Sequence, residues 1–258
     1  MAGDPLTHWE GEPVAVWRRV WRVPGVEAYA RVTSSNDVAS LRAQEGAEPY
    51  TVILAEEQLE GRGREGRAWH SPPDTGIWMS VLLPSSSPPP LHLPLLVGVG
   101  VARALEDAVP GLVTRVEWPN DLTLGGRKVA GILCEAGHGA VIAGVGINVR
   151  RLPHGIAGAV AREATSLEEE SGGAVSRPAV VGAVLRELKS LVGSGPGREL
   201  APGIWEELKE RDALFGRGVV SSRHGKGTAR GIAPDGALLL ETAPGHVERV
   251  IAGSVRPL

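Results

Sequence analysis

Four short apolar segments follow one another between residues 113 and 149, and they constrain the fold more than any other part of the chain. They are rich in β-branched residues and mostly shorter than ordinary helices, which is typical of strands. Gly125 and Gly126 stand where a tight hairpin turn needs positive φ angles. The pattern predicts a mixed, mainly antiparallel sheet with strands at residues 113–118, 122–124, 128–134 and 140–149.

Helices accompany this sheet. Ser34 to Asp37 offer side-chain oxygens that cap a helix running through Leu41, and apolar residues recur at helical spacing further along. Residues 1–32 have no decisive period, and WRRVWRV (17–23) suggests at most a short strand. We predict the other helices at 95–109, 178–191 and 198–211, further strands at 50–55 and 77–83, and loops at 84–94, 150–177 and 193–197.

The pattern changes after Asp212. Short β segments punctuated by glycines, such as GTARGIA and GALLLETA, replace the helices. We therefore predict two domains, a larger one over residues 1–211 and a small barrel-like β domain over 212–258. The expected fold class is α+β.

The composition excludes several classes of protein. Apolar residues make up 42% and charged residues 22%, and the net charge of −3 argues against a protein that coats nucleic acid. No signal-peptide pattern and no run of about 18 apolar residues occurs, so we expect neither secretion nor membrane insertion. Cys134 is the single cysteine, which fits a reducing cytoplasm and predicts a core residue rather than a nucleophile.

Residues 61–67, GRGREGR, hold three arginines and three glycines and follow a predicted strand. Glycine lets the backbone approach a ligand closely, and arginine supplies fixed donor pairs for phosphate or carboxylate. The segment lacks the Gly-Lys-Ser/Thr of a Walker loop and does not repeat. It predicts an anion-binding loop, with a solvated surface turn as the alternative.

A second polar cluster surrounds the hairpin turn. Pro119 fixes the backbone so that Asn120 and Asp121 leave a strand end, and Lys128 returns on the facing strand. Such a cluster suits a nucleotide phosphate and a metal, and the alternative is an ordinary turn beside a surface lysine. The segment GVGIN (144–148) lacks the third glycine and the helix of a dinucleotide-binding site, which excludes a Rossmann fold.

Together these motifs resemble those of the biotin protein ligase family. The resemblance covers about residues 33–258 and implies a class II synthetase-like catalytic domain over 1–211 and an SH3-like β-barrel over 212–258. The motifs are SSN (34–36), Gln58, GRGREGRAWHSP (61–72), WPND (118–121), RKVAGILCE (127–135), GVGIN (144–148), ATSL (164–167) and GTARGIAPDGALLLETAPGHVERVIAGSV (227–255).

The resemblance also implies a reaction and the residues that perform it. Biotin and ATP form biotinyl-AMP, and biotin then passes to a lysine of a carboxylase's biotin carboxyl carrier domain. Lys128, Arg64 and Asp121 are the implied catalytic residues, with Mg²⁺ accompanying ATP near Asp121. The implied biotin-binding residues are Ser34, Ser35, Asn36, Gln58, Arg62, Gly63, Arg64, Lys128, Gly131 and Gly144. The implied ATP- or adenylate-binding residues are Arg62, Arg64, Arg67, Trp69, Asn120, Lys128 and Asn148.

The resemblance also assigns a role to three glycines of the predicted sheet. Gly131, Gly144 and Gly146 are expected to let the backbone of the sheet lie close to the ligand.

Two features depart from the family's pattern. Glu117 precedes WPND where many relatives carry a basic residue, which is expected to change only the local charge. About 33 residues precede SSN, too few for the helix-turn-helix domain of repressor members, so no nucleic-acid partner is expected. The alternatives are a lipoate or octanoate ligase or transferase, and a non-catalytic biotin- or nucleic-acid-binding module. A homodimer is compatible with the sequence.

Overall fold

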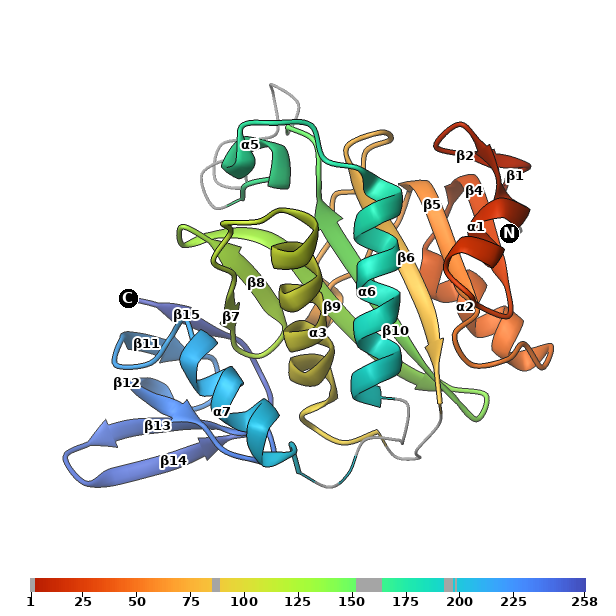
Figure 1. The fold of residues 1–258 in the computed structure, drawn as a ribbon. Coiled ribbons are helices and arrows are strands. Elements are labelled where there is room, and N and C mark those ends of the chain that lie inside the picture. The colour runs from red at the N-terminus through yellow and green to blue at the C-terminus, as the bar shows by residue number, and fades with distance from the viewer. Residues whose placement is uncertain (1–2, 85–88, 152–163, 193–196, 198) are drawn as a thin grey trace.

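An eight-stranded sheet with helices on both faces forms the body of the molecule (Figure 1). The computed structural model describes residues 3–84, 89–151, 164–192, 197 and 199–258. The strand order is β1-β4-β5-β6-β10-β9-β8-β7; β4 and β5 pair in parallel, and the other neighbours pair antiparallel. The predicted α+β class with a mixed, mainly antiparallel sheet is confirmed.

Strands β5 to β10 lie close to their predicted positions, whereas β1 and β4 fall at residues for which no strand was predicted. Gly125 and Gly126, at φ 57° and 80°, make the predicted hairpin turn. The strand predicted over 113–118 is shorter than expected, because the Thr114 N–H donates to the Glu106 carboxylate (2.8 Å) instead of joining the ladder. The bounds are β1 Pro5–Leu6, β4 Val26–Val32, β5 Val52–Gln58, β6 Gly76–Leu83, β7 Arg115–Glu117, β8 Asp121–Leu124, β9 Arg127–Gly137 and β10 Ala140–Asn148.

The four predicted helices are present with small shifts at their ends. Helix α3 (Leu93–Ala108) begins inside the predicted loop 84–94 because Pro94 lies in its first turn, where a missing N–H costs nothing. Their bounds are α2 Ser35–Gln44, α3 Leu93–Ala108, α6 Arg177–Val192 and α7 Pro202–Arg211. Residues 85–88, 152–163, 193–196 and 198, on which parts of the predicted loops and the start of the predicted helix 198–211 fall, lie outside the described residues.

A short helix, α5 (Leu167–Ser171), lies within the segment predicted as a loop. Ser166 caps it by accepting a hydrogen bond from the Glu169 N–H (3.3 Å). The spacing of a capping serine and a glutamate three residues later was a signal for this helix.

The expectation of a strand at residues 17–23 is wrong. Residues Val14–Val20 form helix α1, after the two-stranded hairpin of β2 (His8–Trp9) and β3 (Glu12–Pro13). Trp17 and Trp21, one helical turn apart, stack at 5.3 Å, and Trp9 meets both edge-on. The Trp21 indole N–H donates to the carbonyl of Pro178 on α6 (3.2 Å). Aromatic packing against α6 therefore decides the conformation here, which a local period does not reveal.

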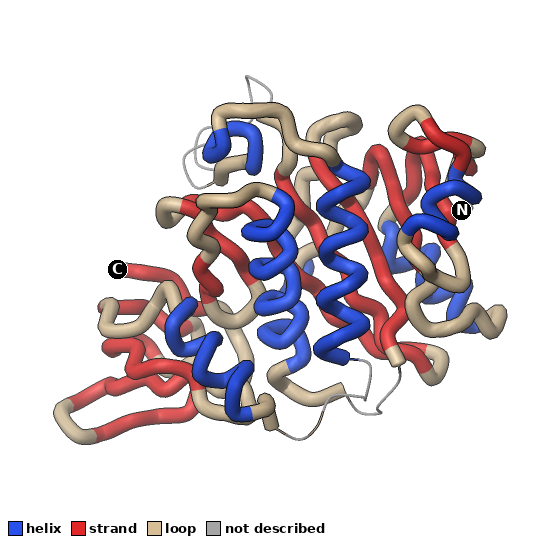
Figure 2. Tube along the Cα trace, viewed as in Figure 1, coloured by secondary structure: helices blue, strands red, loops and turns tan. Residues whose placement is uncertain are grey.

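The two faces of the main sheet carry different helices. Helices α3 and α6 pack side by side on one face, and α2 covers part of the other (Figures 1 and 2). In β10, Val141, Val145 and Ile147 join the core under α3 and α6, while Ile142 joins the smaller core under α2. Because side chains alternate along a strand, Gly144 and Gly146 lie on the α2 face.

The C-terminal part forms a separate five-stranded antiparallel sheet with the order β14-β13-β12-β11-β15, beside helix α7 (Figure 1). It meets the main sheet near Trp118, whose indole N–H donates to the Gly236 carbonyl (2.9 Å). The bounds are β11 Gly218–Ser221, β12 Gly225–Ile232, β13 Leu238–Ala243, β14 His246–Val250 and β15 Val255–Pro257. Of the helices in the described ranges, none combines the length and apolarity needed to span a membrane.

Candidate active site

A cavity of about 780 Å³ opens on the α2 face of the main sheet. Its walls come from the start of α2, the arginine loop 61–69, strands β8 to β10 and residues 253–257 of the C-terminal sheet. This size suits a ligand of a few hundred daltons. The predicted site residues on its wall are Ser34, Ser35, Asn36, Gln58, Arg62, Gly63, Arg64, Arg67, Trp69, Asn120, Asp121, Lys128, Gly131, Gly144 and Gly146.

Lys128 and Asp121 meet in this cavity, as the hairpin turn predicts. The Lys128 ammonium donates to Asp121 Oδ2 at 2.6 Å, and both side chains are partly exposed to the cavity. Asp121 Oδ1 is buried and has no hydrogen-bond partner among the described residues. The ammonium also lies 5.0 Å from the centre of the Trp69 ring. The Lys128 ammonium therefore has further N–H donors available to a ligand, and Asp121 has an oxygen available as an acceptor.

Asn120 supports this pair from the turn between β7 and β8. Its side-chain amide donates to the Ile132 carbonyl (2.7 Å), and its own carbonyl accepts from the Ile132 N–H (2.9 Å). These two bonds fix the start of β8 against β9, one residue before Asp121.

The SSN turn and Gln58 form a polar cluster at the α2 end of the cavity. Gln58 Oε1 accepts from the N–H and hydroxyl of Ser35 (2.9 and 3.1 Å), and its Nε2 donates to Ser71 (2.9 Å). Asn36 donates to Glu135 and accepts from Ser80, both at 2.5 Å. These bonds hold most of the polar atoms in fixed orientations.

Ser34 completes this cluster and differs from its neighbours. It is the N-cap residue of α2 and lines the cavity, yet its side chain makes no capping bond. Its hydroxyl is therefore available to a ligand.

The arginine loop is a narrow hairpin rather than an irregular turn. Isolated bridges join Gln58 with Ser71 and Arg62 with Ala68. The Trp69 N–H donates to the Gly61 carbonyl (2.8 Å), and the Gly63 N–H to the Arg67 carbonyl (2.7 Å). The tip therefore has a defined conformation, which supports a built site over a solvated surface turn.

The three arginines of the loop differ in their partners. Arg62 makes a two-bond ion pair with Asp37 of α2 (3.1 and 2.5 Å), and Arg67 lies 3.5 Å from Glu65 on the exposed tip. Arg64 forms no ion pair with any described residue, and its guanidinium carbon lies 6.0 Å from the Trp118 ring centre. Burial lowers the pKa of Arg64. An arginine still keeps its charge at neutral pH. Arg64 is therefore the loop cation best placed to meet an anion.

Trp69 lies flat against the sheet, and two glycines make this possible. A Cβ at Gly146 would come within 2.6–2.7 Å of three indole atoms, and one at Gly131 within 2.8 Å. These glycines are direct partners across β9 and β10. Gly144 is likewise covered by Asn36, whose Oδ1 lies 2.5 Å from the place that a Cβ would take. The space left by these three glycines is thus occupied by the side chains of Trp69 and Asn36, which themselves line the cavity.

Comparison with known proteins identifies the family. A model of the biotin/lipoate A/B protein ligase family matches residues 28–151, and a model of the biotin protein ligase C-terminal domain matches residues 223–255. The biotin–[acetyl-CoA-carboxylase] ligase of Mycobacterium tuberculosis is 32% identical over 245 residues, which are 91% of this chain and 89% of that protein. The chain belongs to the biotin protein ligase family.

Other family members resemble it in sequence or structure. A bifunctional ligase/repressor of Bacillus subtilis is 33% identical over 82% of this chain, which spans 66% of that protein's length. The biotin protein ligase of Aquifex aeolicus in complex with biotin and ATP superposes with a TM-score of 0.77 at 27% identity, covering 91% of this chain and all of that one. The Leishmania major ligase in complex with biotinyl-5-AMP gives 0.61 at 25% identity, covering 88% and 98%.

Asn148 is the one predicted site residue of this biotin protein ligase family member that does not line the cavity. It is buried, and its amide donates to the carbonyls of Thr165 (3.0 Å) and, more weakly, Lys128 (3.5 Å). The Thr165 N–H in turn donates to the Lys128 carbonyl (2.9 Å). Asn148 thus fixes the backbone behind Lys128, and its expected contact with adenine stays a prediction.

Cys134 is not among the residues that line the cavity. It packs against the core, and burial raises the pKa of its thiol to about 12. A thiol with so high a pKa is a poor nucleophile at neutral pH, as the sequence predicts.

One part of the wall was missed by sequence reasoning. Residues 253–257 of the C-terminal sheet reach the cavity, and the exposed Arg256 belongs to them. Glu117 also lines the cavity. The contribution of 253–257 depends on how the two sheets meet, for which the local sequence carries no signal.

Asp121 is the carboxylate of the cavity wall best placed to bind a divalent cation. Among the described residues, no group of three histidine, cysteine or carboxylate side chains could hold a metal by itself. Mg²⁺ does not require such a cage, since it is commonly bound by one or two carboxylates together with substrate phosphates. The unpartnered Asp121 Oδ1 fits that mode of binding.

Proposed function

We propose that this cavity activates biotin with ATP as biotinyl-AMP and passes it to a lysine of a carboxylase carrier domain, as expected of a biotin protein ligase. The observation that carries the proposal is the meeting in one cavity of the Lys128–Asp121 pair and Arg64, which has no ion-pair partner among the described residues. The first step develops anionic charge at the α-phosphate, and the second releases AMP. Fixed cations in a partly enclosed site stabilise both.

The biotin end of the cavity is proposed to lie at the SSN turn. A ureido ring needs donors and acceptors in fixed orientations. Ser35 and Gln58 are held by bonds to each other, and Asn36 is held by Ser80 and Glu135. Ser34 supplies a free hydroxyl beside them. Pre-oriented groups cost less ordering on binding, which favours discrimination of the ring over an isosteric apolar chain.

Lys128 is proposed to stand between the two reactants. Its ammonium has three hydrogens, and Asp121 takes one of them. The others are free to meet the biotin carboxylate and the α-phosphate, which lowers the repulsion between two anions. A carboxylate oxygen then forms the bond to phosphorus as the bond to pyrophosphate breaks. In the second step, the carrier lysine attacks the biotinyl carbonyl, AMP leaves and the amine loses a proton.

Mg²⁺ is proposed to bind at Asp121 Oδ1 together with the phosphates of ATP. When bound, it would neutralise charge on the leaving pyrophosphate. Asp121 would at the same time keep Lys128 oriented through Oδ2.

The nucleotide end is proposed to lie between the arginine loop and the C-terminal sheet. Arg64 would hold the adenylate phosphate, with Arg62, Gly63 and Arg67 shaping the loop around it. Trp69 offers a flat surface beside Lys128 for a ring system, and Arg256 adds a cation from the opposite wall. The two predicted domains, divided near residue 212, would thus share one site, because residues from both line the cavity.

The packing of Trp69 gives a prediction for Gly146→Ala. Gly146 does not have a positive φ, so its backbone accepts alanine, but the new Cβ would collide with the indole. We expect a folded protein, destabilised by about 1–3 kcal/mol, in which Trp69 is displaced and ATP binds roughly tenfold more weakly. Calorimetric titration with ATP measures the affinity, and thermal unfolding measures the stability.

Gly203→Ala in α7 is the matched control, because nothing lies within 4 Å of its Cβ position. It is expected to bind ATP as the native protein does. Native affinity in Gly146→Ala would show that the position of Trp69 does not matter to the nucleotide.

Transfer to a carrier tests the proposed function against its nearest rival. The match of residues 223–255 to a biotin protein ligase C-terminal domain favours biotin over lipoate or octanoate. With ATP, Mg²⁺ and a purified biotin carboxyl carrier domain, we expect biotin on the acceptor lysine, detected by mass spectrometry. A carrier whose acceptor lysine is replaced by arginine is the control. Octanoyl or lipoyl transfer in place of biotinyl transfer would establish the rival.

A further inference from the structure

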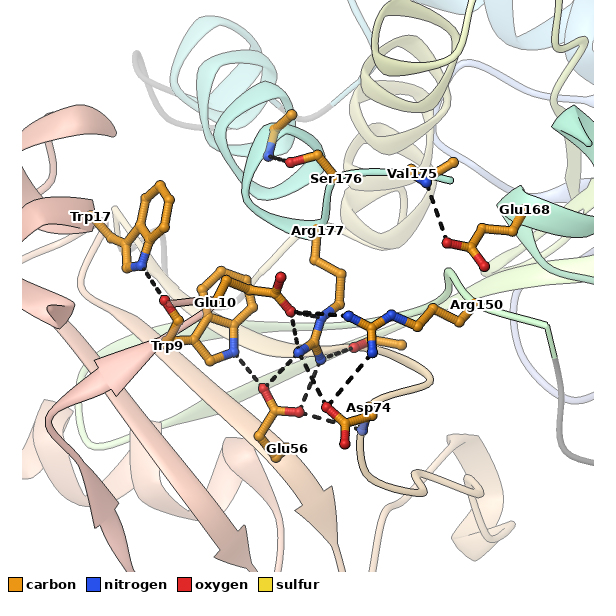
Figure 3. A network of polar contacts seen from close by, with 12 residues as sticks. Trp9, Glu10, Trp17, Glu56, Asp74, Arg150, Glu168, Val175, Ser176 and Arg177 are labelled. Carbon is orange, nitrogen blue, oxygen red and sulfur yellow. Dashed lines mark hydrogen bonds and ion pairs between the residues drawn. The ribbon is translucent and has the colours of Figure 1, made fainter. Parts of the chain in front are cut away.

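A buried guanidinium, drawn in Figure 3, lies at the start of α6, which packs on the face of the main sheet opposite the cavity. It belongs to Arg177, the first residue of α6, whose side chain is only 4% exposed. Its donors reach two carboxylates and a backbone carbonyl, and its carbon lies 5.3 Å from the Trp9 ring centre. The reaction proposed above does not use this group.

The bonds of Arg177 join the two ends of the segment that carries the arginine loop. Glu56, near the end of β5, receives two parallel bonds of 3.0 Å from the guanidinium. The carbonyl of Gly76, the first residue of β6, receives a third bond of 3.0 Å. Asp74 closes the gap between them, because its N–H donates to Glu56 Oε2 at 3.4 Å. The Arg177 guanidinium therefore binds both Glu56 and Gly76, the residues that flank the segment 57–75.

The N-terminal hairpin completes the surroundings of this guanidinium. Glu10 accepts from Arg177 Nε at 2.5 Å, and the Trp9 indole N–H donates to Glu56 Oε1 at 2.6 Å. Arg150, just after β10, lies 3.6 Å from Glu10 and 3.7 Å from Asp74. Figure 3 shows these side chains converging on Arg177 from four parts of the chain. Each buried charge thus has opposite charges around it, as burial demands.

The base of the segment is connected to the tip by the hydrogen bonds of the hairpin. Beyond Glu56 and Asp74, the Gln58–Ser71 bridge follows, and then the bond from the Trp69 N–H to the Gly61 carbonyl. A change in the spacing of the two ends would therefore shift Gln58, Trp69 and Arg64 together.

We propose that Arg177 is a positioning residue, which sets the geometry of the arginine loop from behind the sheet and thereby the retention of the adenylate. This inference rests on the proposed function of the cavity. It also gives residues 9 and 10 a part in the reaction, although they lie outside the matched family segment and do not line the cavity.

Arg177→Lys tests the inference because it keeps the charge and loses the fork that spans Glu56 and Gly76. We expect biotinyl-AMP to dissociate about tenfold faster, measured with radiolabelled adenylate formed in place. The affinity for biotin alone should change less than about threefold, since Ser80 and Glu135 hold the SSN turn independently. This difference between the two ligands is not expected of a general loss of stability.

Arg103→Lys is the matched control. Arg103 also forms partly buried ion pairs, with Glu187 and Glu207, but it joins helices far from the loop in sequence. Arg103→Lys is expected to lower the unfolding temperature of the protein but to release biotinyl-AMP at the native rate. Glu10→Gln removes one charge from the same cluster and is the test to use if Arg177→Lys does not fold. We expect this variant to release biotinyl-AMP about two- to fivefold faster than the native protein.

Two results would overturn the inference while leaving the proposed function intact. One is native release from folded Arg177→Lys, or from Glu10→Gln if the lysine variant does not fold. The other is equally fast release from Arg103→Lys. Failure of the native protein to form or retain biotinyl-AMP would instead refute the proposed function, and this inference with it.

Discussion

Lys128→Ala is expected to lower biotin-dependent exchange of pyrophosphate into ATP by about 10²–10³-fold. The alanine variant removes the ammonium that faces both reacting anions and leaves Asp121 without its 2.6 Å partner. The rate falls because charge developing at the α-phosphate loses its nearest fixed cation. The side chain is partly exposed, so the fold should persist. Exchange measured at saturating biotin and ATP separates this effect from weaker binding.

Two further substitutions sharpen this prediction. Lys128→Arg keeps a positive charge but replaces a compact ammonium by a planar fork, so we expect it to restore only a small part of the rate. Lys226→Ala removes an exposed lysine of the C-terminal sheet and should exchange at the native rate. Exchange in Lys128→Ala within a factor of three of the native rate would remove Lys128 from the reacting centre.

Arg64→Ala is expected to release biotinyl-AMP about 10- to 100-fold faster than the native protein. Arg64 is the loop arginine without an ion-pair partner among the described residues, whereas Arg62 is paired with Asp37. Removing it should therefore cost ligand binding rather than internal structure. Release can be followed by trapping free biotinyl-AMP during single-turnover activation.

Arg67→Ala is the comparison within the same loop. Arg67 lies on the exposed tip beside Glu65, and its loss is expected to change release less than about threefold. Equal effects of the two substitutions would mean that the loop contributes only its overall charge.

The meeting of Lys128 and Asp121 was predictable from the sequence because a hairpin fixes register. Gly125 and Gly126 set a short turn that pairs β8 with β9, and Lys128 then lies opposite Thr123, two residues after Asp121. The same local logic located α2 at the SSN turn, although Ser34 makes no capping bond there, and β5 before the arginine loop. The geometry of a motif that depends on one turn or one strand end can therefore be predicted from the local sequence.

Other parts of the site depend on contacts between distant segments. Arg177 meets Glu56 across 121 residues and Glu10 across 167, so no local pattern marks it. Helix α1 was predicted at most as a strand because its tryptophans are ordered by packing on α6. The position of Asn148 has the same origin, since its side-chain amide donates to the carbonyl of Thr165, 17 residues later.

The glycines illustrate a further limit. Gly131 and Gly146 were expected to make room for the ligand, and the sequence alone does not say which neighbour occupies the space above a glycine. The structure places the Trp69 ring there, through a hairpin that folds back over β9 and β10. Their conformational freedom is not needed, because neither has a positive φ.

Biotin-dependent exchange of radiolabelled pyrophosphate into ATP tests the central claim most directly, because it reports formation of the mixed anhydride without any carrier. The native protein with Mg²⁺ is expected to show exchange that requires biotin and is not supported by lipoate or octanoate at the same concentration. Exchange with lipoate or octanoate but not with biotin, or no exchange with any of the three acids, would contradict the account.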